Sequence, residues 1–442
     1  MFLISAAATL VSIACLGISD DRPPPLSFDT HVDYIAWYNE FVSKGKKDNA
    51  YELYKGLMPD KKGAGGIPAP TGEAEKQADK QRGHLWEAKT YPELVAYLKD
   101  CAPFLDIFRK AGSRRDYWRP APADTKLLRG LAFPDLSSCR TATKATLMQA
   151  LMKQEGQFKV VNDACGVVLQ SANHMQQSRN VIGVLVGSAE RASVYDTVAA
   201  ALADGVVDDK DVGTLYATLR RWDPGSADQT HWLSFEWAVS LDTLQFVCVG
   251  GKSDQAKWDE LLNTLDENTP PTENNIKAPD PKEALRLVEE HFSSMAKILS
   301  KPLSLKTARQ LDKFEHQQTA KNEKNTFTAI FFAKFSRAYA LQLRVEAQRR
   351  ATLLILAIHA HHAKHRKWPK SLDQIDKDLG LEGLDQARID PFSGNDFIYK
   401  LRGGEPLLYS VSSNGEDDGG RHEKHWGDND KDSDYVFWPL QR

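Results

Sequence analysis

The segment from Ser336 to Arg366 constrains the fold most, because its pattern is that of one long helix. It reads SRAYALQLRVEAQRRATLLILAIHAHHAKHR, with charged residues toward both ends and an apolar run from Leu353 to Ile358. A helix that is apolar all round is buried on several sides. The dipeptide Trp368-Pro369 ends it, since a residue before proline avoids the α conformation. We therefore expect other elements of the chain to cover this helix.

Upstream of this helix the sequence is mainly helical. Residues 20–58 form an expected N-terminal helical segment, in which aromatic residues recur at helical spacing and predict a core face. Residues 59–83 are rich in Gly, Pro and charge, which is typical of a flexible linker or loop. Residues 84–335 form the expected helical domain. No fixed-period repeat is present, so a regular solenoid is not expected.

Beyond the long helix the pattern changes to strands. The runs NDFIYKL, EPLLYSV and DYVFW are short and β-rich, and Gly-Gly, Asn-Gly and acidic loops separate them. Residues 336–442 are therefore expected to form a long helix plus a short antiparallel sheet. The predicted fold class is mainly α with a small C-terminal α+β subdomain.

The N-terminus predicts the compartment. Residues 1–19 read MFLISAAATLVSIACLGIS, and the breaker DDRPPP follows them. This is the pattern of a signal peptide or N-terminal anchor, and it is short for a transmembrane helix, which needs roughly 20 apolar residues. Acylation at Cys15, which would tether the protein to a membrane, and a buried N-terminal strand or helix stay open as alternatives. We expect an extracytoplasmic protein, periplasmic or secreted.

Charge and cysteine content exclude several classes. The net charge is −3 and the basic residues are dispersed, so a nucleic-acid partner is not expected. Without Cys15, four cysteines remain, which permit two disulfides in three connectivities or four buried free thiols. No CxxC is present, which argues against zinc or thioredoxin-like chemistry. The four are Cys101, Cys139, Cys165 and Cys248.

The order WPKSLDQI, DPFSGNDFIYKL, LLYSVSSNGEDDGG and DYVFW resembles the C-terminal part of the major pseudopilin of type II secretion. The resemblance covers roughly residues 340–440. The upstream sequence at 181–249 resembles uncharacterised exported proteins of planctomycete-type bacteria. This second resemblance implies no biochemical mechanism. The prepilin cleavage motif and the long N-terminal pilin helix are absent from this sequence, so assembly into a pseudopilus is not implied.

In pseudopilins the tail loop binds Ca²⁺, and the resemblance therefore implies a structural calcium site here. The Asp-Gly of that loop falls on Asn414 and Gly415, its next acid on Asp417 or Asp418, and the Asp of the closing segment on Asp434. Asn in place of Asp keeps an oxygen ligand but removes one charge.

The residues themselves support the same ion. Calcium takes about six to eight hard oxygens on a bendable loop. Residues 414–434 hold eight acids against three Lys or Arg, and so many carboxylates repel one another unless water or a cation screens them. The alternative is a solvated acidic loop.

A second cluster, HAHHAKH at 359–365, suggests an alternative function. His361 and His365 are four residues apart and His362 and His365 three, so two imidazoles could share a helical face and bind Zn²⁺. The sequence lacks the Glu of an H-E-x-x-H motif, and a solvated or partly packed face is the other interpretation. Glu236 and Asp242, six apart, are predicted to be structural or surface residues. We identify no catalytic residue and expect a non-enzymatic structural or binding protein, with a metal-dependent hydrolase as the alternative.

Overall fold

The computed structural model describes residues 21–441 except 61, 82, 224, 226–229, 265–276, 323–326, 329–331, 333, 376–378, 380, 423–425 and 427–432. The expected leader at 1–19, with Cys15, lies outside these residues. In the part that is described, no helix combines the length and apolarity that a membrane span requires.

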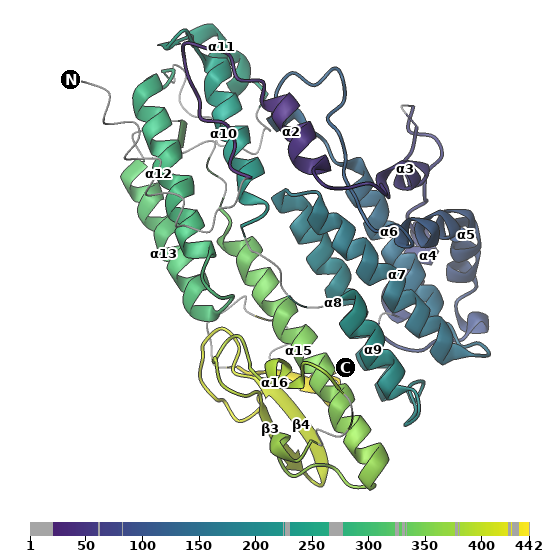
Figure 1. Ribbon diagram of the computed structural model, residues 1–442. Helices are drawn as coiled ribbons and strands as arrows, with labels where there is room; N and C mark the ends of the chain where they lie inside the picture. The colour runs from purple at the N-terminus through teal and green to yellow at the C-terminus, as the bar shows by residue number, and fades with distance from the viewer. Residues whose placement is uncertain are drawn as a thin grey trace.

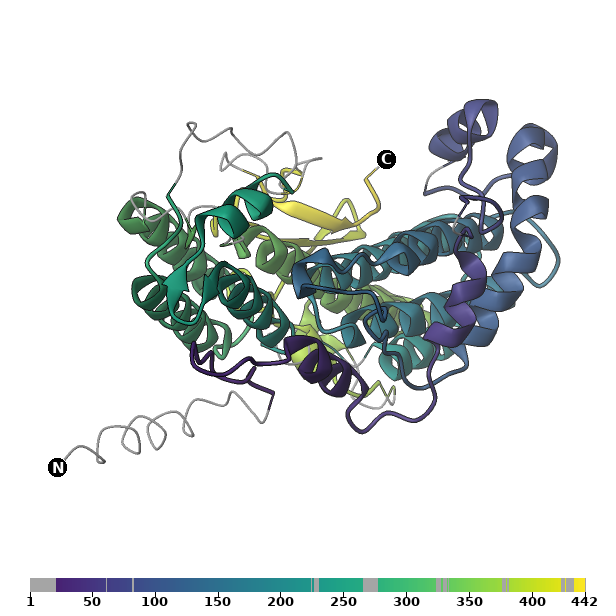
Figure 2. The same ribbon diagram turned by 90° about the horizontal axis from the view of Figure 1, so that it is seen from above.

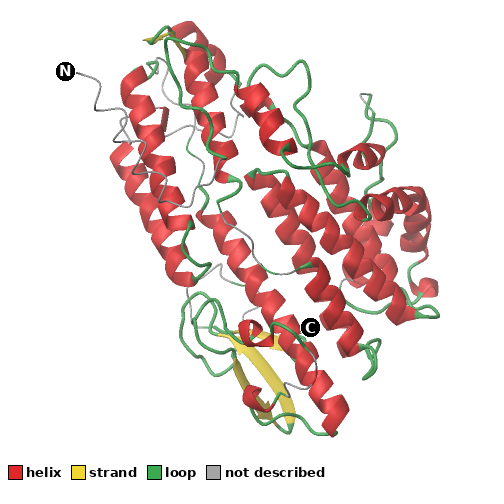
Figure 3. Cartoon of the chain, viewed as in Figure 1, coloured by secondary structure: helices red, strands yellow, loops and turns green. Residues whose placement is uncertain are grey.

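The chain is mainly helical. Its strands are short, and the larger sheet lies near the C-terminus (Figure 3). The helices are α2 (Tyr34–Ser43), α3 (Tyr51–Tyr54), α4 (Gly72–Gln81), α5 (Pro92–Gly112), α6 (Pro134–Ala150), α7 (Gln157–Gln177), α8 (Val181–Ala203), α9 (Val212–Trp222), α10 (Leu233–Val247), α11 (Gln255–Leu262), α12 (Pro281–Leu299), α13 (Leu305–Asn322), α15 (Ser336–His365) and α16 (Leu384–Ala387). The strands are β1 (Cys248–Val249), β2 (Lys252–Ser253), β3 (Ile398–Arg402), β4 (Glu405–Ser410) and β5 (Tyr435–Trp438).

Helix α15 lies between two groups of helices, with α10, α12 and α13 on one side and α7, α8 and α9 on the other (Figures 1 and 2). Tyr339 in its first turns packs into the core of the first group. The stretch from Leu353 to Ile358 packs into the core of the second. The expectation of a helix buried on several sides is confirmed. Because Tyr339 packs with α10, α12 and α13, the helix is not separated from the upstream helices at the domain boundary expected between residues 335 and 336.

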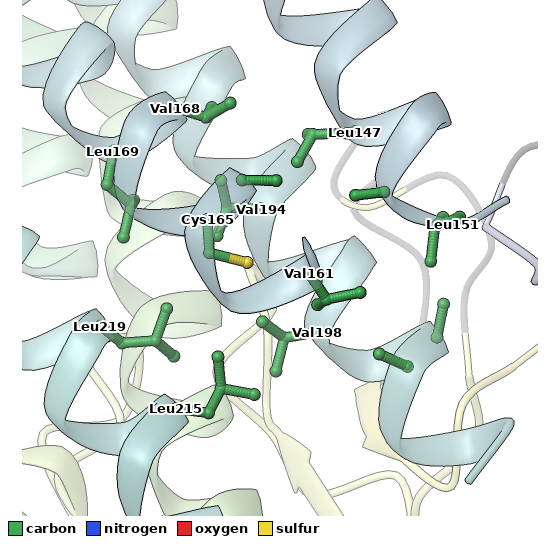
Figure 4. Packing of buried hydrophobic residues seen from close by; sticks show 14 of the residues in the cluster. Leu147, Leu151, Val161, Cys165, Val168, Leu169, Val194, Val198, Leu215 and Leu219 are labelled. Carbon is green, nitrogen blue, oxygen red and sulfur yellow. The ribbon is translucent and has the colours of Figure 1, made fainter. Parts of the chain in front are cut away.

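The larger core is built mainly by α5–α9 and α15. Figure 4 shows side chains of α7 meeting those of α8 and α9 around Cys165. Helices α7 and α8 approach closely because Gly187 has no side chain, and a Cβ there would lie 2.7 Å from the carbonyl oxygen of Ala172. Each buried Val or Leu at such a contact stabilises the fold by about 1.5–3 kcal/mol.

The second core is rich in aromatic residues. Trp237 on α10 and Phe292 on α12 stack with ring centroids 5.7 Å apart. The aromatic stripe of α2 joins this core, with Tyr34, Tyr38 and Phe41 buried. The core face predicted for residues 20–58 is therefore confirmed in α2.

The C-terminal sheet has the order β3-β4-β5, and both pairs are antiparallel. Leu407 of β4 pairs with Lys400 of β3, and Tyr409 pairs with Val436 of β5. Helix α15 contacts β4 and β5, and Figure 1 shows the sheet beside the C-terminal half of this helix. The fold class predicted from the sequence is confirmed: mainly α, with a small C-terminal α+β subdomain.

Part of the expected linker at 59–83 is wrong, because residues Gly72–Gln81 form α4. Ala78 is buried against the larger core, and Gln77 Oε1 accepts a hydrogen bond from the backbone N–H of Leu94 at 3.1 Å. The helix buries only a narrow face, so most of its residues are polar or charged and the segment has the composition of a loop.

The four cysteines that are described are all buried free thiols. Of the two interpretations that the sequence left open, free thiols are confirmed and disulfides are not formed. Cys139 and Cys165 lie on α6 and α7 within the larger core, where they pack as small apolar residues.

Candidate metal centre in the C-terminal loop

The predicted metal ligands lie on the loop that connects β4 to β5. Its first part is an Asx turn at Asn414, whose Oδ1 accepts a hydrogen bond from the backbone N–H of Glu416 at 3.0 Å. The amide nitrogen Nδ2 of Asn414 donates to Asp418 Oδ2 at 2.7 Å. Asn414 and Asp418 are therefore in direct contact, with the amide nitrogen rather than the oxygen facing the carboxylate.

Asp417 is fixed by two hydrogen bonds to one oxygen. Its Oδ1 accepts from the hydroxyl of Tyr409 at 2.9 Å and from the backbone N–H of Gly419 at 2.9 Å. Burial raises the pKa of Tyr409, and the hydrogen bond to Asp417 adds to the rise. The phenol therefore stays protonated and donates to the carboxylate.

Asp434, at the end of the loop, is 0% exposed. Its Oδ2 accepts a hydrogen bond from the backbone N–H of Gly420 at 2.6 Å, whereas its Oδ1 is buried without a partner. Burial raises the pKa of this carboxyl, backbone hydrogen bonding from Gly420 and Asp418 opposes the rise, and the negative charges of Asp417 and Asp418 add to it. The fold thus places three of the predicted ligands in one electrostatic cluster.

Gly420 makes the approach of the loop to Asp434 sterically feasible. Its φ is +82°, a value that favours glycine, and a Cβ there would lie 3.2 Å from Leu407 Cδ2 and 3.3 Å from Tyr409 Cε1. A side chain at 420 would therefore require Leu407, Tyr409 or the loop to shift by a few tenths of an ångström, in addition to the strain of the positive φ. The hydrogen bond between Gly420 and Asp434 depends on that close contact.

Basic side chains hold the loop from both sides. Arg309 of α13 donates through Nη2 to the carbonyl oxygens of Ser413 and Asn414, at 2.9 and 3.1 Å. Arg402 and Lys400 of β3 donate to the carbonyl oxygen of Gly419, at 2.9 and 3.3 Å. These cations offset part of the negative charge of the loop without contacting Asp434 directly.

The fold brings the predicted metal ligands only partly together. Over the described ranges, no group of three or more His, Cys, Asp or Glu side chains has the arrangement that holds a metal. The further acids at 423, 428, 430 and 432 lie outside those ranges. What fits a cation is the unpartnered buried oxygen of Asp434, together with the two carboxylates whose charges act on it.

The histidine cluster at the end of α15 is divided between packing and solvent. His359 packs edge-on against Trp368 and Trp438, and burial lowers its pKa to about 4. His362 stacks on Trp368 with ring centroids 4.0 Å apart. The rings of His361 and His365 have centroids 4.4 Å apart, as the four-residue spacing predicts.

The two acids of α10 have structural contacts. Glu236 Oε1 accepts from the backbone N–H of Val181 at 3.0 Å, at the start of α8. Asp242 Oδ2 accepts from the backbone N–H of Leu128 at 2.8 Å. The structural interpretation of both acids is consistent with these contacts. Burial raises the pKa of Glu236 to about 7 and that of Asp242 to about 6.

Sequence reasoning missed the buried charged residues Arg191 and Arg349. They lie on α8 and α15, more than 150 positions apart in the chain. A basic residue within an apolar helical stretch is the one signal that the sequence offers for each of them, and it does not say which partner they meet.

Comparisons with protein-family models, with curated proteins and with solved structures find no match to this chain.

Proposed function

We propose that the chain is an exported, non-enzymatic structural or binding protein whose pseudopilin-like tail folds around a structural calcium ion. The observation that carries the calcium proposal is the unpartnered, buried Oδ1 of Asp434, the residue just before β5. A buried carboxylate oxygen without a partner loses its hydration and gains nothing in exchange.

A divalent cation would remove this deficit. Asp434, Asp417 and Asp418 would hold it through carboxylate oxygens. Asn414 could add an amide oxygen only if its side chain turned, because its Nδ2 faces Asp418 and its Oδ1 accepts from the N–H of Glu416. Ca²⁺ supplies charge and a cross-link between the loop and β5. It supplies no chemical step, which agrees with a structural role.

The test is thermal unfolding of the purified protein with a chelator and then with excess calcium. A ligand that binds only the folded state stabilises it by about 2.7 kcal/mol at a concentration of 100 times Kd. We expect chelation to lower the Tm and calcium to restore it. An unchanged Tm under both conditions would contradict the calcium proposal.

The variant Asp434→Asn makes the test specific. Asn cannot carry the buried charge, so the variant should ignore calcium, and after chelation it should melt no lower than the wild type. The control is Asp385→Asn, an exposed acid on α16 in the same subdomain, which makes the same change of charge. The control should respond to calcium as the wild type does.

The proposed extracytoplasmic location rests on the leader at 1–19 and is tested by N-terminal sequencing of the mature protein. A new N-terminus close to Ser19 supports export with cleavage. An intact or acylated leader in the membrane fraction supports a tether. A full-length protein recovered only from the cytosol contradicts export.

The alternative hydrolase is supported by one observation, the approach of His361 to His365. It requires stoichiometric zinc in the purified protein, which metal analysis measures. His361→Ala should remove that zinc if the alternative holds and should change nothing if the protein is not an enzyme.

A further inference from the structure

A small, partly open cavity lies where α15 meets α7 and α8. Its volume is about 30 Å³, and its lining includes Arg191 of α8, with Arg349 and Gln342 of α15. The exposed fractions of these three residues are 6%, 6% and 8%. The cavity therefore has unusually polar walls for an interior that is otherwise formed by apolar helical faces.

Arg191 is bound on one side of its guanidinium. Nη2 donates to Asn173 Oδ1 at 2.6 Å and to Gln176 Oε1 at 3.1 Å, and Nε lies 3.3 Å from Asp223 Oδ2. Its Nη1 is buried and has no partner. The hydroxyl of Tyr195 also donates to Asp223, so this carboxylate is already shared between two donors.

Arg349 repeats the same pattern from α15. Its Nε and Nη2 donate to the two carboxylate oxygens of Glu346 at 2.8 and 2.9 Å, and its Nη1 is buried without a partner. Gln342, about two turns earlier on α15, also has its donor Nε2 buried and unpartnered. Three donor groups from two helices thus line one cavity with no acceptor for these nitrogens.

The formal charges of the described side chains that line the cavity balance. Arg191 and Arg349 contribute two positive charges, and Asp223 and Glu346 contribute two negative ones. Arg350 lies outside the lining but also binds Glu346, at 2.6 Å, so one carboxylate is shared between two arginines. Burial opposes ionisation of Glu346, but the two arginines beside it lower its pKa overall, so it is charged.

The neighbouring acid on α8, Glu190, does not supply an acceptor to the cavity. Glu190 faces α6, where its Oε1 accepts from Thr143 Oγ1 at 3.0 Å, and it does not line the cavity. Among the described residues at the cavity, what is missing is therefore an acceptor for the three donor nitrogens.

A buried guanidinium nitrogen without an acceptor is costly. Charge-assisted hydrogen bonds to an anion would supply the missing acceptor. A cavity holds a water-sized group once it exceeds roughly 10–15 Å³, so there is room for a small group only. We propose that this cavity binds one small monovalent anion, a halide ion or the carboxylate group of a small ligand, and that the anion joins α8 to α15.

The first test measures Tm at constant ionic strength in a methanesulfonate buffer into which chloride, bromide, formate or acetate is titrated. We expect a saturable rise of Tm with at least one of these anions, because the anion binds the folded state alone. A wild-type protein whose Tm is the same in all of them contradicts the proposal.

The variant Gln342→Met removes one unpartnered donor and keeps every ion pair. We expect it to need at least a tenfold higher concentration of the anion for the same rise of Tm. The matched control is Gln348→Met on the same helix, whose amide instead donates to Asp196 on the surface, and it should behave as the wild type does. Equal responses from Gln342→Met and wild type would overturn the assignment of the site.

The choice of anion distinguishes the two sources. A response to chloride and bromide alone identifies an inorganic ion, and a response to formate and acetate identifies a carboxylate ligand. Anomalous diffraction from bromide-soaked crystals gives a direct check. A bromide peak within hydrogen-bond distance of Nη1 of Arg191 and of Arg349 supports the site, and peaks restricted to surface arginines contradict it.

Discussion

Glu190 Oε1 accepts a hydrogen bond from Thr143 Oγ1 at 3.0 Å, which joins α8 to α6 inside the larger core. The glutamate is 1% exposed, and its Oε2 has no partner. Burial raises its pKa to about 7, above the usual value of 4.5. This carboxyl therefore makes the stability of the helical body depend on pH.

We expect stability to fall as pH rises from about 4.5 to about 7. In this window the folded state keeps the proton and the unfolded state does not, so deprotonation favours unfolding. A tenfold difference in proton affinity between the two states corresponds to about 1.4 kcal/mol of unfolding free energy. Denaturant unfolding at several pH values measures the effect, and Glu190→Gln should flatten the slope. A slope unchanged in the variant would mean that another group is responsible.

His291 on α12 should give the opposite slope. It is stacked on Phe332 with ring centroids 4.0 Å apart, both ring nitrogens are buried without partners, and burial lowers its pKa to about 4. Between pH 6.5 and 4 the imidazole of His291 binds a proton in the unfolded state but not in the folded state, so stability is lost as pH falls. His291→Phe should unfold at higher denaturant concentration than wild type at pH 5. If the difference in denaturation midpoint between His291→Phe and wild type were the same at pH 5 as at pH 8, this prediction would be contradicted.

Gly420 and Gly419 offer a matched pair in the acidic loop. Both have positive φ, +82° and +76°, but only Gly420 has neighbours that a Cβ would meet. Gly419→Ala should lose only the strain of the backbone conformation, about 1–3 kcal/mol. Gly420→Ala should lose more, because the shift that its Cβ requires also disturbs the hydrogen bond to Asp434. Denaturant unfolding compares the two, and equal losses would show that the close contact is unimportant.

The elements that the sequence predicts well are those whose burial is complete. Helix α15 is apolar all round over Leu353–Ile358, and α2 carries an aromatic stripe. In both helices the spacing of apolar residues indicates which faces are buried. Helix α4 was missed because it buries a narrow face. Propensity and pattern cannot reveal a helix that tertiary packing stabilises on so few residues.

The candidate sites were predictable to different degrees. Acids and glycines at 414–434 are visible in the sequence, but the unpartnered oxygen of Asp434 follows from how β5 lies against the loop. Which carboxylate loses its water is a property of the tertiary fold. The cavity between Arg191 and Arg349 was invisible, since it joins two helices that are far apart in the chain.

The cysteines connect the fold to the proposed compartment. Cys101, Cys139, Cys165 and Cys248 are buried free thiols, and burial raises their pKa values, so little thiolate is present at neutral pH. We expect the native protein to react slowly with a thiol reagent and its Tm to be insensitive to a reductant. After denaturation, four thiols should react with the reagent if the leader is removed or acylated, and five if Cys15 is retained as a free thiol. A Tm that falls on reduction would show that a disulfide forms and that the free-thiol arrangement is wrong.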